Sequence, residues 1–231
     1  MLPVVILAGG LATRLHPISE KTPKSLIEVA GQPFIFHQLE YLRNQGITSI
    51  TLCIGFLGEM VKTVVGDGSR WGLDIKYSMD GEKPLGTGGA LRKAIPVVGE
   101  HFFVLYGDSY LPINFSEVEK KYVSSQKHGL MTVLKNNNQW DESNVEFDGN
   151  VIIEYNKSEK RPEMQYIDFG LGILIASVLQ SYKSNQSFGL DQVYNKLSLS
   201  GDLIGYEVHE RFYEIGSHQG IVETHNFLSK K

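Results

Sequence analysis

The stretch that decides the fold is Pro3–Lys24, which reads PVVILAGGLATRLHPISEKTPK. Its first part, Pro3–Ala8, is a short apolar run with β-branched residues, and Gly9-Gly10 closes it. An apolar run of this length that ends in glycines is typical of a strand buried on both faces and followed by a turn. We therefore expect this strand in the interior of a sheet.

The turn after this strand has the composition of a phosphate-binding loop. Adjacent glycines let the backbone approach a ligand closely, and a run of free backbone N–H groups can cradle an anion. Two cations, Arg14 and Lys24, follow along the chain. The spacing, however, matches neither the G-x-G-x-x-G nor the G-x-x-x-x-G-K-[ST] nucleotide fingerprint. These residues alone leave open both a phosphate loop and a purely structural turn.

Length and composition indicate an ordinary globular protein. The chain has 231 residues, 42% of them hydrophobic and 21% charged, which is enough for a sizeable core. The formal net charge of −4 and the lack of a basic face argue against a nucleic-acid partner. The single cysteine, Cys53, lies in the apolar run Ile50–Ile54 and excludes a disulfide framework. No signal peptide and no membrane-spanning run are evident, so we expect a cytoplasmic protein without a membrane partner.

Strand-like and helix-like segments alternate through the first half of the chain. The predicted strands are Pro3–Ala8, Ser49–Ile54, Leu73–Tyr77 and His101–Tyr106, and the predicted helices are Phe34–Asn44, Leu57–Val65 and Thr87–Ile95. This alternation predicts βαβ units and a doubly wound, mostly parallel α/β sheet with helices on both faces. In such sheets ligands bind beyond the carboxyl ends of the strands.

The second half is richer in short strands. The predicted strands are Gly129–Leu134, Ser143–Phe147, Val151–Tyr155, Phe169–Ala176 and Leu203–Val208, and the predicted helices are Ser116–Gln126, Leu190–Leu199 and Ser217–Leu228. The turn Asp148-Gly149-Asn150 between two of these strands is of the hairpin type. No linker or repeat interrupts the chain. We therefore expect residues 1–231 to form a single domain, whose second half, from about residue 136, adds a small β lobe and a closing helix.

Two motifs near the start resemble those of a known family. The segments GGLATRLHP at Gly9–Pro17 and PKSLIEVAGQP at Pro23–Pro33 resemble the signature of the sugar-1-phosphate nucleotidylyltransferases, or NDP-sugar pyrophosphorylases. That signature runs G-G-x-G-T-R-L-x-P, then P-K-x-L and V-x-G-x-P, and Ala12 stands where the family usually has a third glycine. The resemblance implies a Rossmann-like, GT-A-type fold. Because the chain stops after the predicted closing helix, we expect it to lack the C-terminal β-helix of some larger members.

The resemblance also implies a nucleotide site. The segment PLGTGGALR at Pro84–Arg92 is similar to the family's P-L-G-T-A-G-A motif, which contacts the base and ribose. On local chemistry alone, Thr87 could equally be the N-cap of a helix. The residues expected at the nucleotide are Leu7, Ala8, Gly9, Gly10, Thr13, Arg14, Pro84, Gly86, Thr87 and Gly107.

Two carboxylates are expected to hold Mg²⁺. Asp108 ends a predicted strand in LYGDSYL, and a carboxylate beside a polyphosphate site is a natural Mg²⁺ ligand, although an aspartate at a strand end is often a turn or cap residue. It matches the family's G-D motif. Glu214, in FYEIGSHQG, stands at the position of the family's second metal-binding acid, which is usually an aspartate. Ser217 is expected to be the N-cap of the last helix.

The sugar side of the site is implied by weaker matches. Lys157 matches a lysine that contacts the sugar phosphate in the family, although an exposed loop lysine is the alternative. Asp168 and Gly170 lie in YIDFG, which resembles a Y-I-N-A-G-type segment facing the sugar. Lys24 and Asp108 complete the expected substrate-binding set.

These resemblances imply that the chain transfers a nucleotidyl group from an NTP to a sugar 1-phosphate, with Arg14, Lys24 and Asp108 as catalytic residues. The compact length is similar to that of mannose- and heptose-1-phosphate guanylyltransferases, which favours GTP. Uridylyl or thymidylyl transfer to another sugar 1-phosphate, such as an N-acetylmuramate or glucose type, stays open. A silent regulatory subunit is disfavoured because both loop cations and Asp108 are present, and a D-x-D glycosyltransferase because Asp108-Ser109-Tyr110 has no second carboxylate. The expected partners are small-molecule substrates, and the protein is expected to be a monomer or homodimer.

Overall fold

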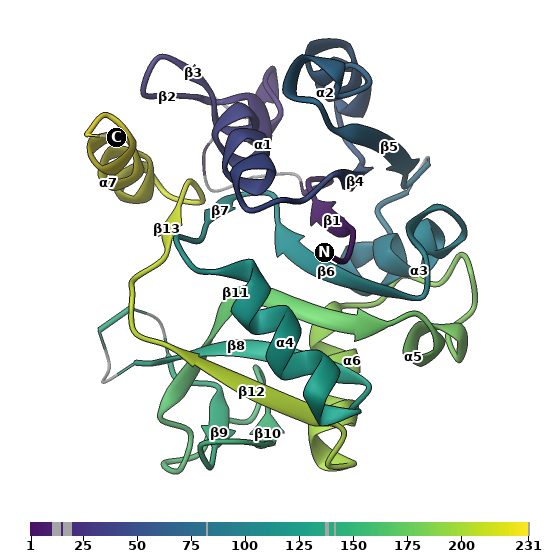
Figure 1. Cartoon of the computed structure of the whole chain (residues 1–231), viewed down its shortest axis with the longest axis vertical. Helices are drawn as coiled ribbons and strands as arrows, with labels where there is room; N and C mark the ends of the chain where they lie inside the picture. Colours follow the sequence, from purple (N-terminus) through teal and green to yellow (C-terminus); the bar gives the residue numbers. More distant parts are fainter. Residues whose placement is uncertain (11–14, 16–19, 82, 137–138, 141, 231) are drawn as a thin grey trace.

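The computed structural model describes residues 1–10, 15, 20–81, 83–136, 139–140 and 142–230 (Figure 1). Within this part of the chain, nine strands form a central sheet in the order β10-β9-β11-β6-β1-β4-β5, with β8 beside β11 and β12 beside β8. The strands of this sheet are β1 (Val4–Leu7), β4 (Ser49–Ile54), β5 (Asp74–Met79), β6 (His101–Tyr106), β8 (Gly129–Lys135), β9 (Val145–Phe147), β10 (Ile152–Tyr155), β11 (Tyr166–Ile175) and β12 (Leu203–Val208). The helices are α1 (Phe34–Asn44), α2 (Gly58–Val65), α3 (Gly86–Val98), α4 (Phe115–Ser125), α5 (Ser177–Gln180), α6 (Leu190–Leu199) and α7 (His218–Leu228).

The N-terminal strand lies at the centre of the sheet. β1 pairs in parallel with β4 on one side and with β6 on the other, and β4 pairs in parallel with β5. Val4, Val5 and Ile6 of β1 are fully buried, because parallel strands of this kind are covered on both faces. Only β10 and β11 run against the other strands of the described sheet. The prediction of a doubly wound, mostly parallel α/β sheet is therefore confirmed.

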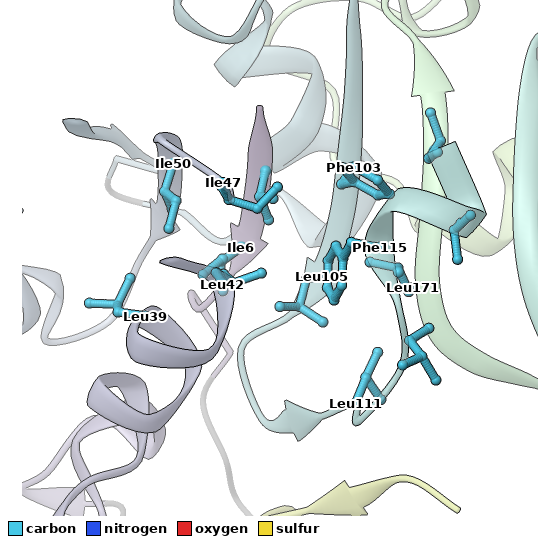
Figure 2. Packing of buried hydrophobic residues seen from close by; sticks show 14 of the residues in the cluster. Ile6, Leu39, Leu42, Ile47, Ile50, Phe103, Leu105, Leu111, Phe115 and Leu171 are labelled. Atoms are coloured by element: carbon cyan, nitrogen blue, oxygen red, sulfur yellow. The ribbon is translucent and has the colours of Figure 1, made fainter. Parts of the chain in front are cut away.

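Helices cover both faces of the sheet. On one face, Ile6 packs with Leu39 and Leu42 of α1 and with Phe115 of α4, a cluster that Figure 2 shows from close by. On the other face, Val5 packs in a cluster with residues of α3, α5 and α6. Alternate side chains of one strand therefore belong to two cores, as the two-residue period of a strand requires.

The long strand β11 begins earlier than the sequence indicated. It starts at Tyr166 rather than Phe169, and its register against β8 shifts between Asp168 and Gly172. Gly170 lies in this irregular stretch with φ of +104°, a conformation that glycine adopts readily. The predicted strand began inside this irregular stretch, so the three residues that precede Phe169 in β11 were missed.

Short two-residue strands hold the end of the chain against the sheet. β7 (Ser109–Tyr110) pairs antiparallel with β13 (Tyr213–Glu214), and β2 (Glu28–Val29) pairs with β3 (Gln32–Pro33). Leu228 of α7 packs with Val29, Phe34, Tyr110 and Ile215 in a separate small core. These strands have two residues each, which is too short for a periodic signal.

Within the described residues, no helix combines the length and the apolar character that crossing a membrane requires.

Candidate active site

A cavity of about 280 Å³ lies where β1, β4, β5 and β6 end. Its described lining consists of Leu7, Ala8, Gly9, Gly10, Lys24, Ser25, Cys53, Asp80, Pro84, Gly86, Thr87, Ala90, Tyr106, Gly107 and Asp108. All the described residues expected at the nucleotide are in this set. The position agrees with the rule that α/β sheets bind ligands beyond the carboxyl ends of their strands. We call this space the inner cavity.

A larger cleft of about 1050 Å³ adjoins the inner cavity. It contains Lys157, Asp168, Gly170 and Glu214 among its lining residues, so the structure brings together the residues expected on the sugar side. Lys24, Tyr106 and Asp108 line both spaces. The boundary between the inner cavity and this outer cleft is therefore the place where a ligand in one would meet a ligand in the other.

Lys24 and Asp108 form an ion pair at this boundary. Lys24 Nζ lies 2.5 Å from Asp108 Oδ2, and the two side chains are 19% and 35% exposed. Lys24 begins a short 3-10 helix (Lys24–Leu26), and Pro23 precedes it with φ of −54°. Asp108 follows β6 through Gly107, where a Cβ would lie only 2.8 Å from the carbonyl oxygen of Leu7. Glycine at position 107 lets the chain pass close to β1, where a larger residue would not fit. The chain can therefore present the Asp108 carboxylate at the boundary.

Glu214 reaches the same point from the far end of the chain. The pairing of β13 with β7 places Glu214 opposite Ser109, the residue after Asp108. The backbone N–H of Gly216 donates to Glu214 Oε2, and Ser217 Oγ donates to Oε1 at 2.7 Å. A Cβ on Gly216 would lie 2.6 Å from Glu214 Oε2, 3.0 Å from Lys24 Nζ and 3.6 Å from Asp108 Oδ2. The lysine and both carboxylates therefore converge around Gly216.

The donor set around Gly216 fits a magnesium ion bound together with phosphates. Among the described residues, no three histidine, cysteine, aspartate or glutamate side chains come together as a complete metal site. Magnesium does not need such a cage, because it usually takes one or two carboxylates and completes its shell with waters and substrate phosphates. Asp108 and Glu214 supply two hard oxygen donors on one side of the boundary. The position of the glutamate, which is longer than the usual aspartate by one methylene, is fixed by its bonds to Gly216 and Ser217.

The loop at Pro84–Thr87 is held by a distant segment. Gly86 has φ of +71°, and a Cβ there would lie 2.6 Å from the carbonyl oxygen of Phe188. Thr87 is not the N-cap of α3, because that helix begins at Gly86. Instead Thr87 Oγ1 accepts a hydrogen bond of 2.8 Å from the backbone N–H of Leu190, the first residue of α6. The alternative of a local helix cap is thus wrong, since the hydroxyl caps a helix that is remote in sequence.

Asp168 lies deep in the outer cleft beside the bulge of β11. Its Oδ1 accepts from the backbone N–H of Gly170 at 2.9 Å, and its own N–H donates to Asn144 Oδ1 at 3.3 Å. Burial raises the pKa of the Asp168 carboxyl, against the opposing effects of Lys157 and of the bond from Gly170. Lys157 lies with Nζ 5.9 Å from the ring centre of Tyr155. Side chains of both signs thus face the cleft, which suits a polar ligand.

Comparison with known proteins decides the family. The family model described as nucleotidyl transferase matches residues 3–231, nearly the whole chain. The chain belongs to the nucleotidyl transferase family. The expected resemblance to sugar-1-phosphate nucleotidylyltransferases is therefore confirmed for the class of enzyme.

Individual relatives of this nucleotidyl transferase carry different substrate names. A D-glycero-alpha-D-manno-heptose 1-phosphate guanylyltransferase of Campylobacter jejuni is 30% identical over 83% of this chain and 84% of its own length. An N-acetylmuramate alpha-1-phosphate uridylyltransferase of Neisseria meningitidis is 34% identical, but over only 55% of either chain. The solved structure of HddC from Yersinia pseudotuberculosis, complexed with GMP-PN, has a TM-score of 0.78 and 24% identity over 99% of this chain and all of its own. This structural likeness confirms the Rossmann-like fold.

Part of the expected site lies outside the described residues of this nucleotidyl transferase. Arg14, expected to be catalytic, and Thr13, expected at the nucleotide, are among these, as is Ala12. Their roles stay predictions from sequence.

The sequence alone did not identify several residues that line the inner cavity and the outer cleft. Asp80 comes directly after β5 and lines the inner cavity, so the rule that pointed to Asp108 at its strand end could have found it. Tyr106, which lines both spaces, is the last residue of β6 and was read only as part of a buried strand. Trp140 and Arg211 line the outer cleft from loops and gave no periodic or motif signal.

Substitution of Gly216 by alanine should disable this nucleotidyl transferase. The added methyl group would overlap the Glu214 carboxylate and press on Lys24, because it would lie 2.6 Å and 3.0 Å from their polar atoms. Displacing a charged group by about 1 Å at the reacting centre costs on the order of a hundredfold in rate. We expect kcat to fall by about that factor in a pyrophosphate-release assay, while Leu199→Ala, at an exposed side chain outside both ligand spaces, leaves kcat unchanged. Wild-type turnover in Gly216→Ala would contradict the convergence described here.

Proposed function

We propose that this nucleotidyl transferase joins a nucleoside triphosphate, with GTP favoured, to a mannose- or heptose-like sugar 1-phosphate, releasing pyrophosphate. The observation that carries the proposal is the meeting of two ligand spaces at the Lys24–Asp108 pair. A nucleotide in the inner cavity and a sugar phosphate in the outer cleft would contact each other at this boundary. Nucleotidyl transfer between two bound substrates needs this arrangement, whereas a sensor of one ligand does not.

The transfer is proposed to be a direct in-line displacement. An oxygen of the sugar phosphate attacks the α-phosphorus of the nucleotide, a new P–O bond forms, and the bond to the β-phosphate oxygen breaks as pyrophosphate leaves. Catalysis then consists of positioning and of neutralising charge. Lys24 bridges the α-phosphate and the incoming sugar phosphate, whose mutual repulsion it offsets. Arg14 is proposed to hold the β- and γ-phosphates.

Asp108 and Glu214 are proposed to hold Mg²⁺ at the boundary. When bound there, the ion supplies positive charge to the phosphate oxygens and polarises the α-phosphate toward attack. The Asp108 carboxylate also bonds Lys24, and so fixes the position of the ammonium group. The bond to Asp108 places the Lys24 charge before the substrates arrive, and such preorganisation is a main source of electrostatic catalysis.

Asp80 supports guanine as the base. The sheet order places the end of β5, where Asp80 follows, three strands or about 14 Å from the end of β6, where Asp108 follows, and the Asp80 carboxylate lies beside Gly9 in the inner cavity. The base is therefore proposed to lie near Asp80 and the phosphates near Asp108. Guanine presents an N–H and an adjacent amino group, both donors, which a carboxylate can accept together. Uracil and thymine present one N–H between two carbonyl oxygens, which the carboxylate would repel.

Asp80→Asn should change the choice of nucleotide. The amide keeps one acceptor oxygen but replaces the other by an NH₂ donor. The variant therefore loses a charge-assisted hydrogen bond from guanine and can donate a neutral hydrogen bond to a uracil carbonyl. We expect kcat/KM for GTP to fall by about tenfold to a hundredfold while the value for UTP rises or stays constant. Asp74→Asn, at the exposed start of β5, is the matched control and should change neither. An unchanged GTP to UTP ratio in Asp80→Asn would contradict this placement of the base.

Removal of divalent metal should stop the reaction. Without Mg²⁺, the single charge of Lys24 would have to offset two carboxylates that face two phosphate groups, so we expect no measurable pyrophosphate release in excess EDTA and full recovery when excess Mg²⁺ is added. Circular dichroism in EDTA should be unchanged, because Lys24 and the loop of Glu214 satisfy the carboxylates. Continued turnover in excess chelator would count against the metal site.

A substrate screen tests the proposed function as a whole. Pyrophosphate release is measured for GTP, UTP, dTTP and ATP, each with mannose, heptose, N-acetylmuramate and glucose 1-phosphates. We expect the highest kcat/KM for GTP with a manno-configured sugar 1-phosphate. A maximum at UTP with N-acetylmuramate 1-phosphate would favour the activity named for the Neisseria relative. No release with any pair would overturn the proposal and favour the silent regulatory subunit instead.

A further inference from the structure

One wall of the outer cleft is built from Trp140, Arg211 and Glu223, which come from three separate parts of the chain. Trp140 follows β8, Arg211 precedes β13, and Glu223 lies on α7. All three line the cleft, and none belongs to a motif singled out from the sequence. We call this set the tryptophan wall.

Arg211 is fixed at the centre of the tryptophan wall. Its guanidinium lies 4.5 Å from the ring centre of Trp140 and 4.7 Å from that of Tyr213. It also donates to Glu223 Oε2 at 2.5 Å, and Gln219 holds Oε1 of the same carboxylate at 2.8 Å. The bond from Arg211 lowers the pKa of Glu223, so the carboxylate stays ionised and the pair stays formed. The charge of Arg211 is thus matched, and its planar group serves to support the indole.

Trp140 presents its remaining surface to the cleft. The residue is 41% exposed, which is unusual for one with a large apolar ring, and the Arg211 guanidinium lies over that ring. Its backbone N–H donates to Asn136 Oδ1 at 3.1 Å, which anchors the residue close to the end of β8. Trp140 therefore combines a ring held by the Arg211 guanidinium with exposed surface in the lining of the outer cleft, which makes it a rigid flat surface available to a ligand.

The tryptophan wall is joined to Glu214 by a short stretch of chain. Arg211 is three residues from Glu214, and an extended chain of that length spans about 10 Å. Phe212 contacts Trp140 at a ring distance of 6.1 Å and Phe169 at 6.0 Å. Phe169 lies between Asp168 and Gly170, the two residues expected to face the sugar. Lys24, the two residues expected at the sugar and Trp140 all line the outer cleft, so the ring of a sugar whose phosphate sat at Lys24 would have Trp140 among the surfaces around it.

We propose that Trp140 is the surface on which the ring of the acceptor sugar stacks, held in place by Arg211 and Glu223. This inference rests on the proposed function. One face of a pyranose carries C–H groups, which are attracted to the electron-rich face of an indole, while the hydroxyl groups at the edge reach the polar side chains of the cleft. Trp140 contacts the sugar and not the phosphate, so it determines which acceptors bind well. Arg211 is a positioning residue.

Tryptophan fluorescence tests the contact directly. The chain has two tryptophans, and the other, Trp71, is buried against Phe36. Mannose 1-phosphate, or the best acceptor of the screen, is added in the presence of a GTP analogue with a methylene group between the α- and β-phosphorus. We expect a saturable change in emission for the wild type, no change in Trp140→Phe, and no change in the wild type with inorganic phosphate. An equal change in Trp140→Phe, or no change in the wild type, would overturn the proposal.

Kinetics give a second, independent readout. In Trp140→Ala we expect KM for the sugar 1-phosphate to rise by about tenfold while KM for GTP is unchanged, because loss of a stacked aromatic contact costs roughly that factor. Trp140→Phe should keep most of the affinity, and truncation of the exposed Leu199 at the end of α6 is the control. An unchanged acceptor KM in an active Trp140→Ala would overturn the proposal. This failure differs from failure of the proposed function, in which the wild type itself would release no pyrophosphate.

Discussion

Replacement of Lys24 by alanine should lower kcat by about a thousandfold or more. Among the described residues that line both ligand spaces, Lys24 is the cation, and its Nζ lies 2.5 Å from Asp108 Oδ2. When the sugar phosphate approaches the α-phosphate, two negatively charged groups must come into contact, and Lys24 offsets that repulsion most strongly as the new bond forms. Loss of one preorganised electrostatic contact costs about 10²–10³ in kcat, and here both reacting phosphates lose it. The measurement is pyrophosphate release at saturating substrates.

The fold should survive this change. The pair is partly exposed, so its contribution to the free energy of unfolding is about 1 kcal/mol or less, and the melting temperature should fall by no more than about 4 °C. Lys120→Ala is the matched control, because Lys120 also forms an ion pair, with Glu117 at 2.8 Å, but on the surface of α4. Its turnover should equal that of the wild type. Wild-type turnover in Lys24→Ala would remove the basis of the mechanism.

Replacement of Asp108 by asparagine should have an effect of similar size through a different cause. The amide keeps the shape of the side chain but has no charge for the metal and no strong acceptor for Lys24. We expect kcat to fall by about a thousandfold at the Mg²⁺ concentration that saturates the wild type. The Mg²⁺ dependence of turnover distinguishes the role of Asp108 from that of Lys24. Its midpoint should move to higher concentration in Asp108→Asn and stay constant in Lys24→Ala.

Asp202→Asn is the control for Asp108→Asn. Asp202 is likewise partly exposed and paired, with His128, but it lies outside both ligand spaces. This variant should have the turnover and the Mg²⁺ midpoint of the wild type. An Asp108→Asn enzyme with an unchanged Mg²⁺ midpoint would place the metal elsewhere, and one with unchanged kcat would contradict any part for this carboxylate in the reaction.

The central sheet could be predicted from the sequence because most of its strands are long or strongly apolar. Val4–Leu7, Ser49–Ile54 and His101–Tyr106 have only apolar or β-branched residues in their buried positions, so local composition and burial agree. In β11 the local composition did not reveal the whole strand. Its register shifts between Asp168 and Gly172, and Asp168 and Gly170 line the outer cleft there. The residues expected to contact the sugar therefore lie at the irregular part of this strand.

The convergence of the charged groups could not be derived from spacing. Lys24, Asp108 and Glu214 are far apart in the chain, and two two-residue strands, β7 and β13, bring the last two together. Strands of that length leave no pattern in a sequence. The family motif supplied these residues, and the structure supplies the reason that they meet, which is a glycine at position 216 that leaves room for all three.

Other contacts depend on tertiary placement alone. Thr87 Oγ1 accepts a hydrogen bond from the first residue of α6, more than a hundred residues away. The sequence around Thr87 does not distinguish this contact from a local helix cap. Trp140 and Arg211 meet because two loops converge over the outer cleft. Asp80, by contrast, ends a strand of the same sheet as Asp108, so a consistent use of the strand-end rule would have included it.

The central claim is that both substrates are bound at once and that the sugar phosphate attacks the nucleotide directly across the Lys24–Asp108 boundary. Isotope exchange between labelled pyrophosphate and the nucleoside triphosphate tests it most directly. If transfer is direct, the label enters the triphosphate only when sugar 1-phosphate or the NDP-sugar product is present, because no nucleotidyl group is ever attached to the protein. We expect no exchange without them and ready exchange with them. Exchange with the triphosphate alone would show a covalent nucleotidyl-enzyme and contradict the account.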